Sequence, residues 1–149
     1  MRLVGFQVQM YRCVMDSTWI PVTPLTVLVG KNESGKTAIL KALHKLNPFH
    51  PEPYHLREWP RGHRGARSTD QVACTAELEL SATEEADLAG LIGTAGPLKR
   101  VKVTRDYGGT LTVVFPASVG AESIPPSAHD YVVSHLPTFV YLDEYGIFR

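Results

Sequence analysis

The chain has 149 residues, of which 44% are apolar and 20% charged, which suits one globular domain with its own hydrophobic core. Fifteen Lys and Arg residues balance fifteen Asp and Glu residues, which excludes a general electrostatic attraction to nucleic acid or to an anionic membrane. No apolar run approaches the roughly 20 residues that span a bilayer, and the two cysteines lack the spacing of a zinc site or a disulfide framework, so we expect a cytoplasmic protein without a membrane partner.

The N-terminal segment predicts three strands. Apolar and more polar residues alternate from Leu3 to Met10, which is the period of a strand with one buried face. A second strand is expected over Thr18 to Val22. Pro24 then introduces LTVLV at residues 25–29, a run with little polar relief that is typical of a central parallel strand buried on both faces.

The stretch GKNESGKT follows at residues 30–37, and a helix is predicted directly after it. Apolar residues recur there at helical spacing until Asn47 and Pro48 end the helix. These apolar residues are Ala38, Ile39, Leu40, Ala42, Leu43 and Leu46. The stretch therefore connects a predicted strand to a predicted helix.

Residues 50–70 are rich in Pro, Gly, Arg and His and show no hydrophobic period, which predicts an exposed loop. Within it, REWPRGHRGAR at residues 57–67 contains four arginines around Trp59. Such a segment could contact DNA phosphates and stack a base, or it could be a solvated loop tethered by one aromatic side chain. We favour the second interpretation.

Regular patterns resume after this loop. QVACTAELEL alternates strictly and predicts a strand, and Ser81 with Glu84 forms a capping-box pattern that opens a helix ending at Gly93. Two alternating runs around Asp106-Tyr-Gly-Gly then predict a β-hairpin. Residues 116–126 suggest another loop, and FVYL at residues 139–142 resembles a last strand that leads into Asp143 and Glu144.

The stretch at residues 30–37 fits the pattern GxxxxGK(S/T), which binds nucleotide phosphates. Its glycines let the backbone curl so that successive N–H groups point at the phosphates, aided by the positive end of the following helix. Lys36 would reach the β- and γ-phosphates as the catalytic lysine, and Thr37 would bind Mg²⁺. We therefore expect ATP and Mg²⁺ as ligands. The residues expected to contact the nucleotide are Gly30, Lys31, Asn32, Glu33, Ser34, Gly35, Lys36, Thr37 and Ala38.

The string PLTVLVGKNESGKTAILKAL, preceded by a strand and a Tyr11-Arg12 pair, resembles the start of ATPases of the RecF, SMC and OLD group. These are ABC-like heads used in DNA repair, DNA processing and phage defence. The resemblance implies an α/β P-loop NTPase fold, with a mixed β-sheet around a central P-loop helix and residues 1–149 as a single ATP-binding domain. In such proteins an arginine on the first strand pair often approaches the nucleotide, and Arg12 matches that place. The alternative is a surface arginine at the end of a strand.

A complete head of this kind also carries an LSGG-like signature, a strand that ends in a catalytic glutamate and a switch histidine. No LSGG-like segment occurs in the sequence. We therefore expect the N-terminal lobe of a larger ATPase, as a fragment or as one piece of a split protein, whose hydrolysis of ATP requires C-terminal elements. The resemblance implies as partners a second ATPase head or a C-terminal half, with DNA bound through the larger assembly.

The segment FVYLDE at residues 139–144 has three interpretations. As a Walker B strand, it would place Asp143 at Mg²⁺ and Glu144 as the catalytic, water-activating residue. In the proteins that the chain resembles, however, a similar segment occupies the place of the Q-loop, and the catalytic strand comes later. The third interpretation is a solvated strand end.

The sequence also allows three other functions. A GTPase could use the DxxG of residues 143–146, but the guanine-selecting NKxD is absent from the sequence. A small kinase would need an arginine-rich lid, for which only residues 57–67 qualify. A nucleotide-sensing interaction module would bind ATP without hydrolysing it.

Overall fold

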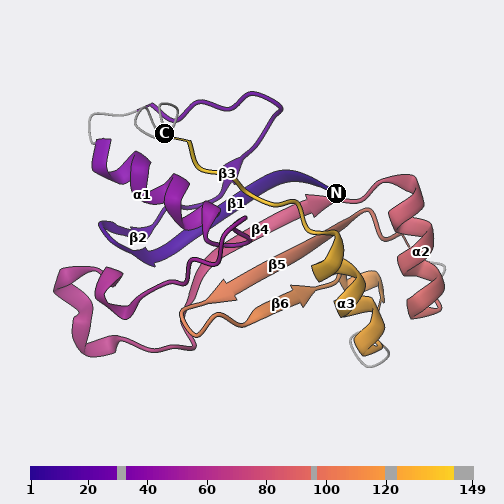
Figure 1. Cartoon of the computed structure of the whole chain (residues 1–149). Coiled ribbons are helices and arrows are strands. Elements are labelled where there is room, and N and C mark those ends of the chain that lie inside the picture. The colour runs from indigo at the N-terminus through magenta and orange to yellow at the C-terminus, as the bar shows by residue number, and fades with distance from the viewer. Residues whose placement is uncertain (30–32, 95–96, 120–123, 143–149) are drawn as a thin grey trace.

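The computed structural model describes residues 1–29, 33–94, 97–119 and 124–142 (Figure 1). Its centre is a sheet in the order β2-β1-β4-β5-β6, with β3 also paired to β1. The strands are β1 (Arg2–Tyr11), β2 (Val14–Asp16), β3 (Ile20–Pro21), β4 (Val72–Glu79), β5 (Arg100–Asp106) and β6 (Leu111–Val114). All the ladders between these described strands are antiparallel.

The alternating segments of the sequence form the central strands, as predicted. In β4, Cys74, Ala76 and Leu78 are fully buried, whereas Thr75 and Glu77 lie on the more exposed face. The hairpin predicted around residues 106–109 joins β5 to β6, and Gly109 adopts φ +88°, a left-handed conformation that glycine adopts without steric cost. The strand predicted over Thr18 to Val22 is confined to the short β3.

Helices cover two parts of the sheet (Figure 1). The first helix, α1 (Glu33–His44), packs on β1 and β4, while α2 (Ala82–Ile92) and α3 (Pro126–His135) pack against each other at the other end of the sheet. The capping box is confirmed, because Ser81 accepts a hydrogen bond from the Glu84 N–H and the Glu84 side chain accepts one from Ser81 N–H. Gly93 ends α2 at φ +77°, also as predicted.

The helix α3 is an element that our sequence analysis did not predict. Pro126 is its first residue, a position at which proline is favoured because the missing N–H has no partner there anyway. Ala128 and Val132, four residues apart, are buried. These two signals could have identified the helix.

Two segments that we predicted as strands are not strands in the structure. Residues 25–29 pair with no strand in the described part of the chain, and the side chains of Leu25, Val27 and Val29 are 83%, 71% and 89% exposed. With other described residues, residues 139–142 form only one parallel bridge, between Phe139 and Pro48. A strand that is buried on both faces needs hydrogen-bonded neighbours and a covering layer on each side, and the described residues provide neither. The expected parallel centre of the sheet is therefore not formed among them.

The buried side chains form two clusters. One lies between α1 and the sheet and is closed by aromatic residues of the segment at 50–70 and the β5–β6 hairpin, namely Tyr54, Trp59 and Tyr107. The other lies between the sheet and the α2–α3 pair. Among the described residues, no helix has the length and apolar character needed to cross a membrane.

Candidate functional site

The predicted phosphate loop leads into the N-terminal end of α1. Gly30, Lys31 and Asn32 lie outside the described residues, and α1 begins at Glu33. Gly35, Lys36 and Thr37 therefore lie in the first turns of the helix, where all three are partly buried. The helix thus begins within the motif, earlier than the start after residue 37 that the sequence predicts.

The orientation of α1 is set by small residues on its inner face. Ala38 and Ala42 are buried against the sheet, and Leu46, four residues further, is buried just beyond the helix. Small side chains let a helix lie close to the strands beneath it, which here are β1 and β4. The N-terminal turns of α1 are thereby held at a fixed place beside the sheet.

This arrangement suits a nucleotide with Mg²⁺. The first N–H groups of a helix have no partner within the helix, and together with the helix dipole they favour an anion. Lys36 adds an ammonium group and Thr37 a hydroxyl oxygen at the same end of α1. In the described parts of the chain, no cluster of three or more His, Cys, Asp or Glu residues could hold a metal by itself. Asp143 and Glu144 lie outside the described residues, so their metal-binding and catalytic roles stay predictions.

Arg12 occupies the turn between β1 and β2, where it adopts a left-handed φ of +54°. Its backbone N–H donates to the carbonyl oxygen of Glu58 at 2.5 Å. Its side-chain Nε also donates to Oε2 of Glu58, and the guanidinium forms an ion pair with that atom at 3.3 Å. Both its backbone and its side chain are thus bound to one residue of the segment at 50–70.

Glu58 is a site residue that our sequence reasoning did not single out. Its carboxylate accepts hydrogen bonds from Lys45 Nζ and Tyr11 Oη, both at 2.7 Å, and from the His55 N–H at 3.0 Å. Burial acts to raise the pKa of Glu58, but the bonds from Lys45, His55 and Tyr11 outweigh it and lower the pKa to about 2. Glu58 therefore joins the segment at 50–70 both to Lys45, just beyond α1, and to the β1–β2 turn.

Glu58 and the residues bonded to it, Lys45, Tyr11 and Arg12, form a group that we call the Glu58 cluster. This cluster and the phosphate loop lie toward opposite ends of α1. Lys45 follows the last turn of the helix, with its N–H bonded to the carbonyl of Lys41. Its backbone is nine residues beyond Lys36, which corresponds to about 13 Å along a helix axis. Arg12 is held by the cluster at this C-terminal end, so its approach to a nucleotide stays a prediction.

The segment at residues 139–142 runs beside α1. Together with Leu40, Leu43 and His44 it lines an open groove of about 330 Å³. The ring of Tyr141 lies near His44, and the Lys41 ammonium is 5.5 Å from its centre. The side chains of Val140 and Leu142 are nevertheless 64% and 71% exposed. Residues 139–142 thus run beside α1 with much of their apolar surface uncovered.

The comparisons with known proteins agree with this arrangement. Residues 1–107 match the family of AAA ATPase domains. A solved structure from work on the structural biochemistry of ATP-driven dimerization and DNA-stimulated activation of SMC ATPases is similar with a TM-score of 0.53 and 13% sequence identity, covering 99% of this chain and 89% of that one. None of the curated proteins matches the chain. The structural likeness confirms the fold of an SMC-like ATPase head, and the match over residues 1–107 shows that the chain belongs to the AAA ATPase domain family.

Proposed function

We propose that the chain binds ATP and Mg²⁺ through residues 30–38, as the N-terminal, P-loop lobe of an ATPase of the SMC, RecF and OLD type. The observation that carries this proposal is the start of α1 at Glu33, which puts Lys36 and Thr37 in the first turns of a helix packed on the sheet. The backbone N–H groups of the loop and of α1 would hold the phosphates. The Lys36 ammonium would neutralise the terminal phosphates, and the Thr37 hydroxyl would bind the metal.

Bound Mg²⁺ would supply charge neutralisation at the β- and γ-phosphates. Lys36 would hold the terminal phosphate in one position and stabilise the negative charge that develops on it. Glu144 would orient or activate water if residues 139–144 act as a Walker B strand. In the Q-loop-like interpretation, water activation would fall to a residue of another segment, and this chain would bind ATP with little turnover.

The exposed apolar segments support the second of these outcomes. Leu25, Val27 and Val29 lead into the phosphate loop, while Val140 and Leu142 lead toward Asp143, and all five are largely exposed. Strands of a C-terminal half, added beside these segments, would bury them and complete a parallel centre of the sheet. That half would also supply the signature motif, so hydrolysis would depend on it.

The matched SMC structure suggests the wider setting. The work on that structure describes ATP-driven dimerization and DNA-stimulated activation of SMC ATPases. By analogy, this chain would act in the cytoplasm as part of a dimer of ATPase heads that works on DNA, in repair, processing or phage defence. A module that senses ATP without hydrolysing it is the competing proposal, and the same exposed segments would then bind a different partner.

The central test is a titration of a fluorescent ATP analogue, with Mg²⁺, into the wild type and Lys36→Ala. We expect the substitution to weaken binding about ten- to hundredfold, because a hydrogen bond to a charged group contributes about 1.5–3 kcal/mol. Lys41→Ala is the matched control, since Lys41 lies on the same helix near its C-terminal end. Phosphate release in the same samples should stay near background for the wild type.

Three results would contradict the proposal. Equal binding of the ATP analogue by the wild type and Lys36→Ala would show that the phosphate loop is not the binding site. Turnover by the wild type that Lys36→Ala and Glu144→Gln both abolish would show that residues 139–144 are a Walker B strand and that hydrolysis needs no further half. A preference for GTP over ATP would move the assignment to a GTPase.

A further inference from the structure

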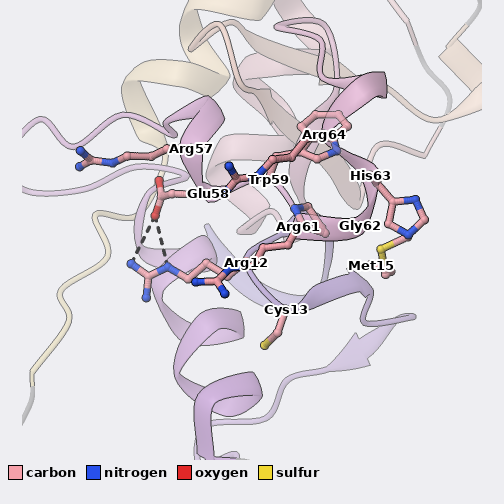
Figure 2. Close-up of a pocket in the computed structure, with 11 residues that line it drawn as sticks. Arg12, Cys13, Met15, Arg57, Glu58, Trp59, Arg61, Gly62, His63 and Arg64 are labelled. Carbon is pink, nitrogen blue, oxygen red and sulfur yellow. Dashed lines mark hydrogen bonds and ion pairs between the residues drawn. The ribbon is translucent and has the colours of Figure 1, made fainter.

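An open cavity of about 720 Å³ lies beside the β1–β2 turn (Figure 2). The turn contributes Arg12, Cys13 and Met15 to its lining. The rest of the lining comes from residues 57–64, which include parts of two short 3₁₀ helices, η1 (Leu56–Glu58) and η2 (Arg61–Ala66). Residues 57–64 therefore form one wall of this cavity, and the β1–β2 turn forms the other.

The lining of this cavity is strongly cationic. It contains four guanidinium groups and one imidazole, from Arg12, Arg57, Arg61, Arg64 and His63. Its one carboxylate, Glu58, is already paired with the buried Lys45 ammonium at 2.7 Å and with Arg12 at 3.3 Å. An excess of positive charge remains, although the whole chain has a formal net charge of zero.

Three of these arginines have no anionic partner among the described residues. Within the part of the chain that the structure describes, Arg57, Arg61 and Arg64 are exposed and form no ion pair, in contrast to Arg2 and Arg100 on the sheet. Neighbouring cations repel one another, and an anion between them relieves that repulsion. The cluster is thus suited to a ligand with more than one negative charge.

The cavity is also held in shape before any ligand arrives. Trp59 is 3% exposed, its ring packs on Tyr107, and Pro60 beside it is buried. Glu58, on the same short helix as Arg57, is bonded to Lys45, just beyond α1, and to Tyr11 at the end of β1. Because these contacts anchor the backbone between Arg57 and Arg61, little ordering of that part of the lining is needed when a ligand binds.

We infer that this cavity is a second anion site, which binds phosphate groups independently of the phosphate loop. Guanidinium groups bind phosphate oxygens through paired hydrogen bonds, and a cavity of several hundred Å³ has the size of a small-molecule site. The phosphates could belong to a free polyphosphate compound or to the backbone of a nucleic acid, since the cavity is open. Both sources present the same chemical group to Arg57, Arg61 and Arg64.

The test measures binding of inorganic tripolyphosphate and, separately, of a short duplex DNA. Both are titrated into a Lys36→Ala background, which removes the competing phosphate loop, and into the same background with R61A and R64A added. The exposed positions of Arg61 and Arg64 allow these substitutions without loss of the fold, which thermal unfolding checks. K99A with K102A is the matched control, because it removes two positive charges outside the cavity.

We expect R61A with R64A to weaken binding at least about tenfold, because the pair removes two guanidinium groups that would hydrogen-bond to charged phosphate oxygens. The control pair should change it little. Loss of tripolyphosphate binding supports a small-molecule site, and loss of DNA binding alone supports a nucleic-acid contact. The inference is overturned if the Lys36→Ala chain binds neither probe, if R61A with R64A leaves binding unchanged, or if the control pair weakens it equally.

Discussion

Two apolar parts of the chain differ in what covers them. In β4, Cys74, Ala76 and Leu78 are fully buried, since α1 and the α2–α3 pair cover this face and β1 and β5 pair with the strand on either side. The segment at residues 25–29 is just as apolar in sequence, yet Leu25, Val27 and Val29 are largely exposed. The difference shows that hydrophobicity specifies a need for burial, while neighbouring strands determine whether it is met.

The same difference separates two kinds of strand. An alternating strand needs one covered face, which α1 or the α2–α3 pair provides within this chain. A continuous apolar strand needs cover on both faces and partners at its edges. Among the described residues, only the alternating strands have the cover that they need. The unsatisfied segments at 25–29 and 139–142 mark the face where we propose that a second half binds.

The largest effect should come from a cavity in the covered region. Leu78→Ala should lower the free energy of unfolding by about 3 kcal/mol, because a fully buried leucine loses both its burial and its packing. Leu25→Ala removes the same atoms from an exposed site and should change stability by less than about 0.5 kcal/mol. Urea denaturation of both variants measures this contrast. Similar losses in the two variants would mean that residues 25–29 are covered in solution.

A second large effect should come from Glu58, which joins the segment at 50–70 to the covered region. Removing one partner of a buried ion pair leaves the other charge uncompensated, so Glu58→Gln should cost about 3 kcal/mol at neutral pH. Glu79→Gln is the control, because the ion pairs of Glu79 with Arg2 and Arg100 are exposed and should contribute about 0–1 kcal/mol.

This effect should depend on pH with a definite sign. The folded-state pKa of Glu58 is lowered to about 2 from an ordinary value of 4.5. A lowered pKa contributes stability that is complete above the unfolded-state value and is lost as the pH falls through the folded-state value. The difference between wild type and Glu58→Gln should therefore shrink as the pH falls from about 4.5 to about 2. If the free energies of unfolding of wild type and Glu58→Gln, measured by urea denaturation, differ by the same amount across this pH range, Glu58 is not the group responsible.

The smallest effect should come from the uncovered segment itself. Val27→Ser with Val29→Ser should leave the free energy of unfolding within about 0.5 kcal/mol of wild type, because both side chains are exposed. The variant should nevertheless bind less of a dye that fluoresces on apolar surfaces, since it removes part of an exposed patch. Unchanged dye binding would show that the accessible apolar surface lies elsewhere.

The sequence by itself determined the features that depend on nearby residues. The capping box of Ser81 and Glu84, the left-handed ends at Gly93 and Gly109, and the alternation of β4 are all set within a few positions. The phosphate-loop pattern at residues 30–37 and the helix after it belong to the same class. Local signals of this kind depend on backbone conformation and side-chain period, which are readable along the chain.

The tertiary structure alone decided what depends on distant residues. Arg12 and Glu58 are 46 positions apart, and no spacing in the sequence indicates that they pair. The exposure of residues 25–29 likewise depends on whether other strands lie beside them. Burial and ion pairing are properties of surfaces that meet in space, so a pattern along the chain predicts which residues require a partner but not which partner they have.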